Sequence, residues 1–128
     1  MNAYQLQRRG NLYYTEAAFR GPSSVSVDLT LIDTGSTYTL VSPKILQALG
    51  YDLNNQTRHV PIVSASRREN PYQVDLEWIQ ALGIKEDNFP VLAYALSPEL
   101  RIDVVLGMDF MLKNKIRLDL GRGIAEIP

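Results

Sequence analysis

The sequence predicts a mainly β protein, an all-β fold closed or folded over into a barrel with one or two short helices. Apolar and polar residues alternate in several short segments, which is typical of strands with one buried face. Turn-forming sequences such as GPSS and GRG separate these segments. Clear helical spacing is confined to the segment around residues 42–49. About eight or nine short strands with so little helix favour a barrel.

The first half of the chain contains three predicted strands and this helix. Residues 11–20, NLYYTEAAFR, are rich in aromatic side chains, and residues 25–31 alternate strictly between apolar and polar. The segment TYTLV follows as a third strand. Ser42 suits the N-cap of the helix, Pro43 its first position and Gly50 its end.

The second half is predicted to contain two hairpins. RHVPIVSAS and PYQVDLEWIQAL are expected to pair as strands around a polar tip, although EWIQAL is equally compatible with a helical turn. GIKEDN is expected to be a loop and FPVLAYAL the next strand. RIDVVLG is almost continuously apolar, as in a strand buried on both faces, and MDFMLKN suits a short helix. IRLDL, GRG and IAEI are expected to form the closing hairpin.

The composition indicates one globular domain at residues 11–128, preceded by a flexible segment at residues 1–10. With 13 basic and 14 acidic residues, the net charge of −1 gives no reason to expect a nucleic-acid partner. The absence of cysteine excludes disulfides and thiolate metal sites. A Ser-His-Asp or Cys-His mechanism would depend on His59 alone, and TRHVPIV is the setting of a strand residue.

The sequence also predicts no membrane partner. The N-terminal segment MNAYQLQRRGNLYY lacks the apolar core of a signal peptide. No apolar run approaches the ~20 residues of a membrane-spanning helix. We therefore expect a cytoplasmic protein.

One acidic residue, Asp33, stands inside the apolar sequence LTLIDTGSTYTLVS. Asp-Thr-Gly is also an ordinary turn sequence, because Asp favours the first position of a turn and Gly supplies positive φ. Here, however, apolar residues flank the triplet on both sides, where a surface turn is not expected. A second apolar segment that ends in glycine, VVLG, lies far downstream at residues 104–107.

LIDTGST followed by VVLGMDF resembles the retropepsin-like family, the single-domain aspartic proteases of retroviral type. The resemblance spans roughly residues 12–127 and implies an acid-protease-type barrel that functions as a twofold homodimer. Asp33, Thr34, Gly35 and Ser36 match the active-site loop of that family. Val105-Leu106-Gly107 matches its second signature, which packs against the loop. The helix at residues 42–49 and the long C-terminal hairpin are more similar to cellular and bacterial members than to viral ones.

Hydrolysis of a peptide bond by carboxylates requires two of them. One accepts a proton from water and the other supplies a proton to the amide, and two Asp side chains a few ångströms apart share one proton. The chain is too short for two lobes, and its nearest second candidate, Asp119-Leu120-Gly121, lacks the hydroxyl residue. A pair must therefore come from two chains, each contributing Asp33 as the catalytic residue. No metal or organic cofactor is implied.

The resemblance implies roles for the neighbouring residues. The hydroxyl of Thr34 is expected to form a hydrogen bond across the twofold axis, and Gly35 N–H and the Ser36 hydroxyl to donate to Asp33. Gly107 is expected to be a structural signature residue. The run Val104, Val105 and Leu106 is expected to support the loop or line the substrate cleft, although core packing explains it equally well.

The hairpin tip near residues 64–71 is expected to be a flap that closes over an extended peptide. Its predicted substrate contacts are Val63, Ser64, Ala65 and Ser66. Viral flaps have glycine-rich tips, whereas SASRRENP contains no glycine and three charged residues.

The chain also departs from the viral pattern at the subunit interface. Viral members carry an acid two residues after the active-site glycine and an arginine after the second signature, and these form an ion pair. Here the two positions hold Thr37 and Met108. We expect Tyr38 and Met108 to fill this space with apolar contacts.

Three function classes fit the sequence. The first is a homodimeric aspartic endopeptidase that cleaves extended peptides or proteins with apolar residues near the cut. The alternative is a non-catalytic retropepsin-like module for dimerisation or peptide binding; the intact DTGS sequence opposes it and the glycine-free flap favours it. The third is a monomeric β-barrel with an internal pocket for a small molecule.

Overall fold

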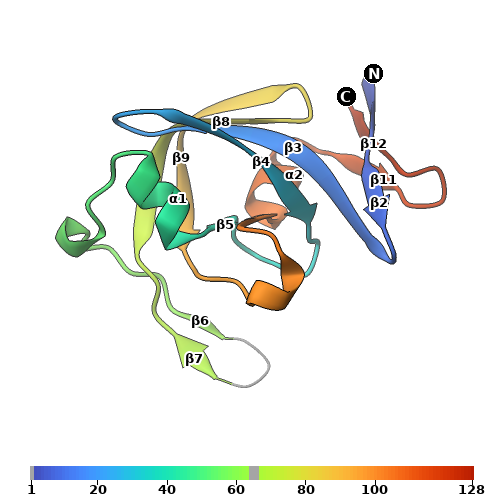
Figure 1. Ribbon diagram of the computed structural model, residues 1–128. Helices are drawn as coiled ribbons and strands as arrows, with labels where there is room; N and C mark the ends of the chain where they lie inside the picture. The colour runs from blue at the N-terminus through green and yellow to red at the C-terminus, as the bar shows by residue number, and fades with distance from the viewer. Residues whose placement is uncertain (1, 64–66) are drawn as a thin grey trace.

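The computed structural model in Figure 1 describes residues 2–63 and 67–128. Its centre is a seven-stranded sheet in the order β2-β3-β4-β10-β5-β9-β8. An additional pairing between β3 and β8 closes six of these strands into a barrel, which confirms the predicted fold class. The strands of this sheet are β2 (Gln7–Arg9), β3 (Leu12–Arg20), β4 (Val25–Ile32), β5 (Leu40–Val41), β8 (Gln73–Ala81), β9 (Ile84–Ala93) and β10 (Val104–Leu106).

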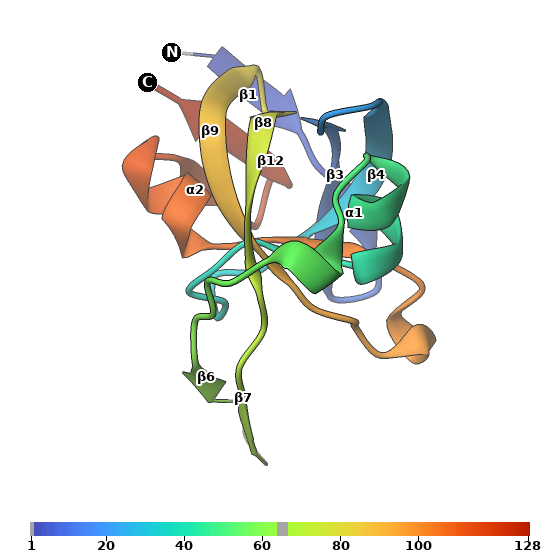
Figure 2. The same ribbon diagram turned by 90° about the vertical axis from the view of Figure 1, so that its left-hand side faces the viewer.

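Two small sheets and two short helices complete the described structure. β1 (Asn2–Gln5), β12 (Ile124–Ile127) and β11 (Arg117–Asp119) form a three-stranded sheet in that order. β6 (Ile62–Val63) and β7 (Arg68–Glu69) form a hairpin that extends away from the barrel in Figures 1 and 2. Figure 2 shows α1 (Pro43–Ala48) and α2 (Met108–Lys113) on opposite sides of the barrel. Single 3-10 turns occur at Leu53–Asn55 and Pro98–Leu100.

The core lies inside the barrel because each strand turns its apolar positions inward. β8 begins with this alternation, with Val74 and Leu76 buried and Asp75 and Glu77 exposed, and the buried positions then shift by one residue to Ile79 and Ala81. Phe110 of α2 meets Phe89 of β9 edge to face, with the ring centres 5.8 Å apart, and so fixes α2 against the barrel. The segment EWIQAL, which was compatible with a helical turn, belongs to β8.

The N-terminal segment differs from the sequence-based expectation of a flexible tail. Residues 2–5 pair with β12 at the other end of the chain, and residues 7–9 pair with β3. Leu6, between them, is buried in the main core. Neither the polar composition of this segment nor its spacing indicates a partner so distant in sequence.

The segment GIKEDN is also not a loop, because β9 begins at Ile84. The turn is only Leu82-Gly83, and both residues have positive φ, 52° and 73°. Such a pair matches the twist of a two-residue hairpin. Leucine is an unusual residue at such a position, which is why the sequence placed the turn too late.

The order of the central strands brings the two distant motifs together. β10 lies between β4 and β5, parallel to β4 and antiparallel to β5. Val105 pairs with Leu31, and Leu106 pairs with Ile32. Parallel strands end at the same edge of a sheet, so Asp33 after β4 and Gly107 after β10 are neighbours.

Candidate active site

Asp33 is held by backbone hydrogen bonds at the end of β4. Its N–H donates to the carbonyl of Leu106 over 3.1 Å, and its own carbonyl accepts from the N–H of Ser36 over 3.2 Å. The N–H of Gly35 donates to Oδ1 of Asp33 over 2.9 Å, as expected. The carboxylate is therefore fixed in direction by its own loop.

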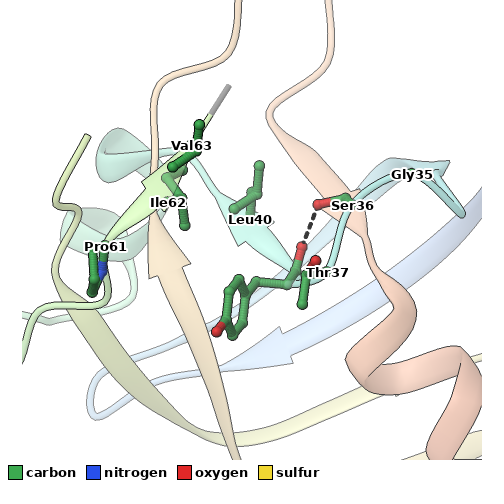
Figure 3. Close-up of a pocket in the computed structure, with 8 residues that line it drawn as sticks. Gly35, Ser36, Thr37, Leu40, Pro61, Ile62 and Val63 are labelled. Carbon is green, nitrogen blue, oxygen red and sulfur yellow. Dashed lines mark hydrogen bonds between the residues drawn. The ribbon is translucent and has the colours of Figure 1, made fainter. Parts of the chain in front are cut away.

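The hydroxyl of Ser36 has a different partner from the expected one. It donates to the carbonyl of Tyr38 over 2.7 Å, shown by the dashed line in Figure 3, and not to Asp33. A hydroxyl that bonds the backbone two residues onward is a common way to close a tight turn. Ser36 thus stabilises the shape of the loop.

The active-site loop lies at the surface of the single chain. Asp33 is half-buried, and Thr34 and Gly35 are exposed. The apolar flanks of Asp33 did not predict a surface turn, but the chain turns outward as soon as β4 ends. Further enclosure of this carboxylate would have to come from groups other than residues 2–63 and 67–128 of the same chain.

Gly107 packs directly against the loop. A Cβ at this position would lie 2.5 Å from both C and O of Tyr38 and 2.9 Å from O of Ser36. Two backbone hydrogen bonds stabilise this contact. The N–H of Met108 donates to the carbonyl of Ser36 over 2.8 Å, and the N–H of Asp109 donates to the carbonyl of Thr37 over 3.1 Å. Glycine is required here for space, because its φ of −99° suits any residue.

A side-chain network beneath the loop was missed by the sequence reasoning. Thr39 is fully buried, and its hydroxyl donates to Oδ1 of Asp109 over 2.7 Å and accepts from the N–H of Gly107 over 3.1 Å. Oδ2 of Asp109 accepts from the backbone N–H of Thr39 over 2.9 Å. The acid in the first turn of α2 was a weak signal for Asp109, and nothing in the sequence marked Thr39.

We expect Thr39→Val to lower the free energy of unfolding by about 1–3 kcal/mol, because it leaves the buried N–H of Gly107 without its acceptor and removes one of the donors to Asp109. Urea denaturation measures the change. Thr39→Ser keeps the hydroxyl and is expected to lose much less. Equal losses in the two variants would show that the methyl group, and not the network, matters.

A family model described as aspartyl protease matches residues 23–110, a span that contains the loop and the second signature. The chain belongs to the aspartyl protease family. No curated protein sequence matches it significantly.

Two solved structures show that this aspartyl protease family member has a retropepsin-like fold. The crystal structure of a retropepsin-like aspartic protease from Rickettsia conorii matches with a TM-score of 0.73 and 19% identity, covering 97% of this chain and 88% of that one. The retroviral protease-like domain of Ddi1 from Leishmania major matches with a TM-score of 0.60 and 12% identity, covering 93% and 90%. At these identities the likeness concerns the fold alone.

A pocket separates the loop from the β6–β7 hairpin (Figure 3). It has a volume of about 310 Å³, and none of the described residues that line it is charged. Val63, one of the predicted flap contacts, is 74% exposed and lines it. Ser64, Ala65 and Ser66 lie outside the described residues. The other lining residues are Gly35, Ser36, Thr37, Tyr38, Leu40, Pro61 and Ile62.

The run Val104, Val105 and Leu106 is buried in the aspartyl protease fold. Val104 and Leu106 join the main core, and Val105 packs in a smaller cluster with Leu31. These side chains therefore support the loop from behind. Their contact with substrate remains a prediction.

Tyr94 lies at the base of the hairpin, where Glu69 also forms an ion pair with Arg67. A hydrogen bond with Glu69 raises the pKa of Tyr94 above 10.0, and burial and the Glu69 charge add to it. The raised pKa means that this contact stabilises the fold below pH 10, and that the stabilisation is lost as pH rises through the folded-state pKa of Tyr94.

We expect Glu69→Gln to lower the pKa of Tyr94 in an ultraviolet titration. The pKa of Tyr51, raised mainly by burial, should stay unchanged as an internal control.

Within residues 2–63 and 67–128, no group of three or more His, Cys, Asp or Glu side chains is arranged to hold a metal ion. No helix in this part of the chain is long and apolar enough to cross a membrane.

Proposed function

We propose that the chain is an aspartic endopeptidase that works as a homodimer, with one Asp33 from each subunit in a shared catalytic pair. The observation that carries this proposal is the loop itself. The Asp33 carboxylate at the end of β4 accepts a hydrogen bond from the N–H of Gly35. The loop packs against Gly107 and is stabilised by the Thr39–Asp109 network. Each chain has a single Asp-Thr-Gly sequence, and its acid lies at the surface.

Two such carboxyls can activate water when one is ionised and the other protonated. The ionised group accepts a proton as water adds to the carbonyl carbon, and the protonated group donates to the carbonyl oxygen. The first carboxyl, now protonated, then transfers its proton to the amide nitrogen, while the second, now ionised, takes a proton from a hydroxyl of the tetrahedral intermediate, and the C–N bond breaks. Both carboxyls end in the charge state in which the pair can react again.

The substrate that suits this geometry is an extended peptide between the loop and the β6–β7 hairpin. A hairpin can bind such a peptide through main-chain hydrogen bonds, and pockets then receive alternate side chains. The described residues that line the pocket beside Gly35 carry no charge, so it favours an uncharged side chain. A cytoplasmic location remains the expectation from the sequence.

A non-catalytic peptide-binding or dimerisation module is the second candidate. The glycine-free tip of the hairpin favours it, because an enzyme flap must open and close at each turnover. A dimer or peptide binding is compatible with both candidates, so only turnover separates them.

The experiment is incubation of the purified chain with a peptide library between pH 3 and pH 8. We expect cleavage whose rate per chain rises with protein concentration as dimers form. No cleavage by the wild type at any pH in this range would favour the non-catalytic module. In a second series that extends to higher pH, a rate that continues to rise beyond pH 9 would contradict the shared proton.

A further inference from the structure

We propose that a second pocket, at the opposite end of β10 from the active-site loop, binds a small carboxylic acid that has an apolar body. The pocket has a volume of about 420 Å³, which lies within the range of small-molecule sites. Its wall comes from the start of α1 and from the segment between β9 and β10. The inference does not depend on the proposed protease.

Backbone and side-chain contacts bring the polar groups of this pocket together from two parts of the chain. The N–H of Ser42, just after β5, donates to the carbonyl of Asp103, just before β10, over 2.8 Å. Nζ of Lys44, in the first turn of α1, lies 3.3 Å from Oδ1 of Asp103. Arg101 ends the 3-10 turn at Pro98–Leu100, and all four polar residues line the pocket.

Ser42 is a polar residue of this pocket whose hydroxyl lacks a partner. It is only 7% exposed. Among residues 2–63 and 67–128, the hydroxyl neither caps α1 nor forms another side-chain hydrogen bond. Most buried hydroxyls in proteins have a hydrogen-bond partner. At the wall of a pocket, this hydroxyl can donate to a ligand.

The charges of the lining residues select the charge of the ligand. Lys44 and Arg101 contribute two positive charges and Asp103 one negative charge, so the described part of the wall has a net charge of +1. One carboxylate would neutralise this wall, whereas a phosphate dianion would bring a second negative charge close to Asp103. The guanidinium of Arg101 can bind both oxygens of a carboxylate.

The other described residues of the wall are apolar, and they select the body of the ligand. They are Ala95, Leu96, Pro98 and Ile102. Ile102 is buried in the smaller core cluster, and Leu96 packs against that cluster, so this part of the wall is supported from behind. An apolar group that covers it is removed from water, which favours binding. The ligand is therefore a free organic acid or the C-terminal carboxylate of a peptide that ends in an apolar residue.

β10 separates this pocket from the active-site loop. Asp103 precedes the strand and Gly107 follows it, and at 3.3 Å per residue this step covers about 13 Å. Among the described residues, none lines both this pocket and the pocket beside Gly35. An acid bound here would leave the Asp33 carboxylate accessible.

The test is an NMR titration of the ¹⁵N-labelled full chain with hexanoate. The chain carries Asp33→Asn so that the same sample can later receive peptides without cleavage. We expect a Kd of about 1 mM, with shifts of the amide signals of Lys44 and Ile102. The signals of Gly35 and Val63 should stay in place. 1-Hexanol lacks the carboxylate and acetate lacks the apolar body, so each should bind at least about fivefold more weakly.

Two variants identify the groups that hold the carboxylate. Ser42→Ala removes the hydroxyl without a change in charge, and Arg101→Gln removes one cation. Each should raise the Kd for hexanoate at least about threefold. Arg117→Gln is the matched control, because Arg117 is exposed on β11 and does not line the pocket. Its Kd should stay within about twofold, since a distant exposed charge is largely screened.

A peptide that ends in leucine separates the two sources of the carboxylate. Binding of its free acid at the same amides, but not of its C-terminal amide, identifies a peptide end as the ligand. Binding of hexanoate alone identifies a free acid. Both results support the site.

Three results overturn the inference and leave the proposed protease intact. They are no hexanoate binding at about 50 mM, far above the expected Kd, equal binding of hexanoate and 1-hexanol, and a Kd that Arg101→Gln does not change. If Ser42→Ala unfolds, as judged by circular dichroism, Arg101→Gln decides alone, because Arg101 is exposed.

Discussion

Asp33→Asn is expected to reduce kcat/KM for peptide cleavage by at least about 10³-fold, because general acid–base catalysis contributes roughly 10²–10⁴ and the substitution changes both members of the pair. An amide cannot accept a proton from water at neutral or acid pH. The side-chain oxygen of Asn can still accept from the N–H of Gly35, so the loop should keep its shape. The fold and the dimer should therefore survive the change.

A mixing experiment separates a shared pair from a complete site in each chain. Adding excess Asp33→Asn chain to the wild type should draw wild-type chains into mixed dimers that contain one functional carboxyl. Activity should then fall as the inactive chain is added, with total dimer confirmed by sedimentation. Unchanged activity in exchanging dimers, or cleavage by the pure variant near the wild-type rate, would contradict the proposal.

Gly107→Ala is expected to lower the free energy of unfolding by about 1–3 kcal/mol or more, the range for overpacking in a well-packed interior. Its Cβ would lie 2.5 Å from two backbone atoms of Tyr38, which cannot rotate away as a flexible side chain could. Relief requires the whole loop to shift, and this would carry Asp33 out of position. Peptide cleavage should therefore fall in the molecules that remain folded.

Gly121→Ala is the matched control. The nearest atom to a Cβ at Gly121 is Oδ1 of Asp119 at 3.7 Å, an ordinary contact distance. Its stability in urea should remain within about 0.5 kcal/mol of the wild type, as for most surface substitutions. Equal effects of the two substitutions would show that loss of glycine flexibility, and not the contact with Tyr38, determines the result.

The local parts of the fold were predictable from the sequence. Strict alternation over residues 25–31 predicted β4, and the apolar run after Asp103 predicted β10. Both patterns depend only on which side chains of a short segment face the core. The same reasoning failed for β1, whose partner β12 lies at the other end of the chain.

The sequence by itself determined the barrel strands, the acid after β4 and the glycine after β10. The tertiary structure decided which groups meet there: Thr39 and Asp109, 70 residues apart, form the network beneath the loop, and Ser36 bonds Tyr38 in place of Asp33. It also brought Ser42 and Arg101 to one pocket. The physical reason is that periodicity records burial along one segment, whereas hydrogen-bond partners and grooves depend on how distant segments are placed in space.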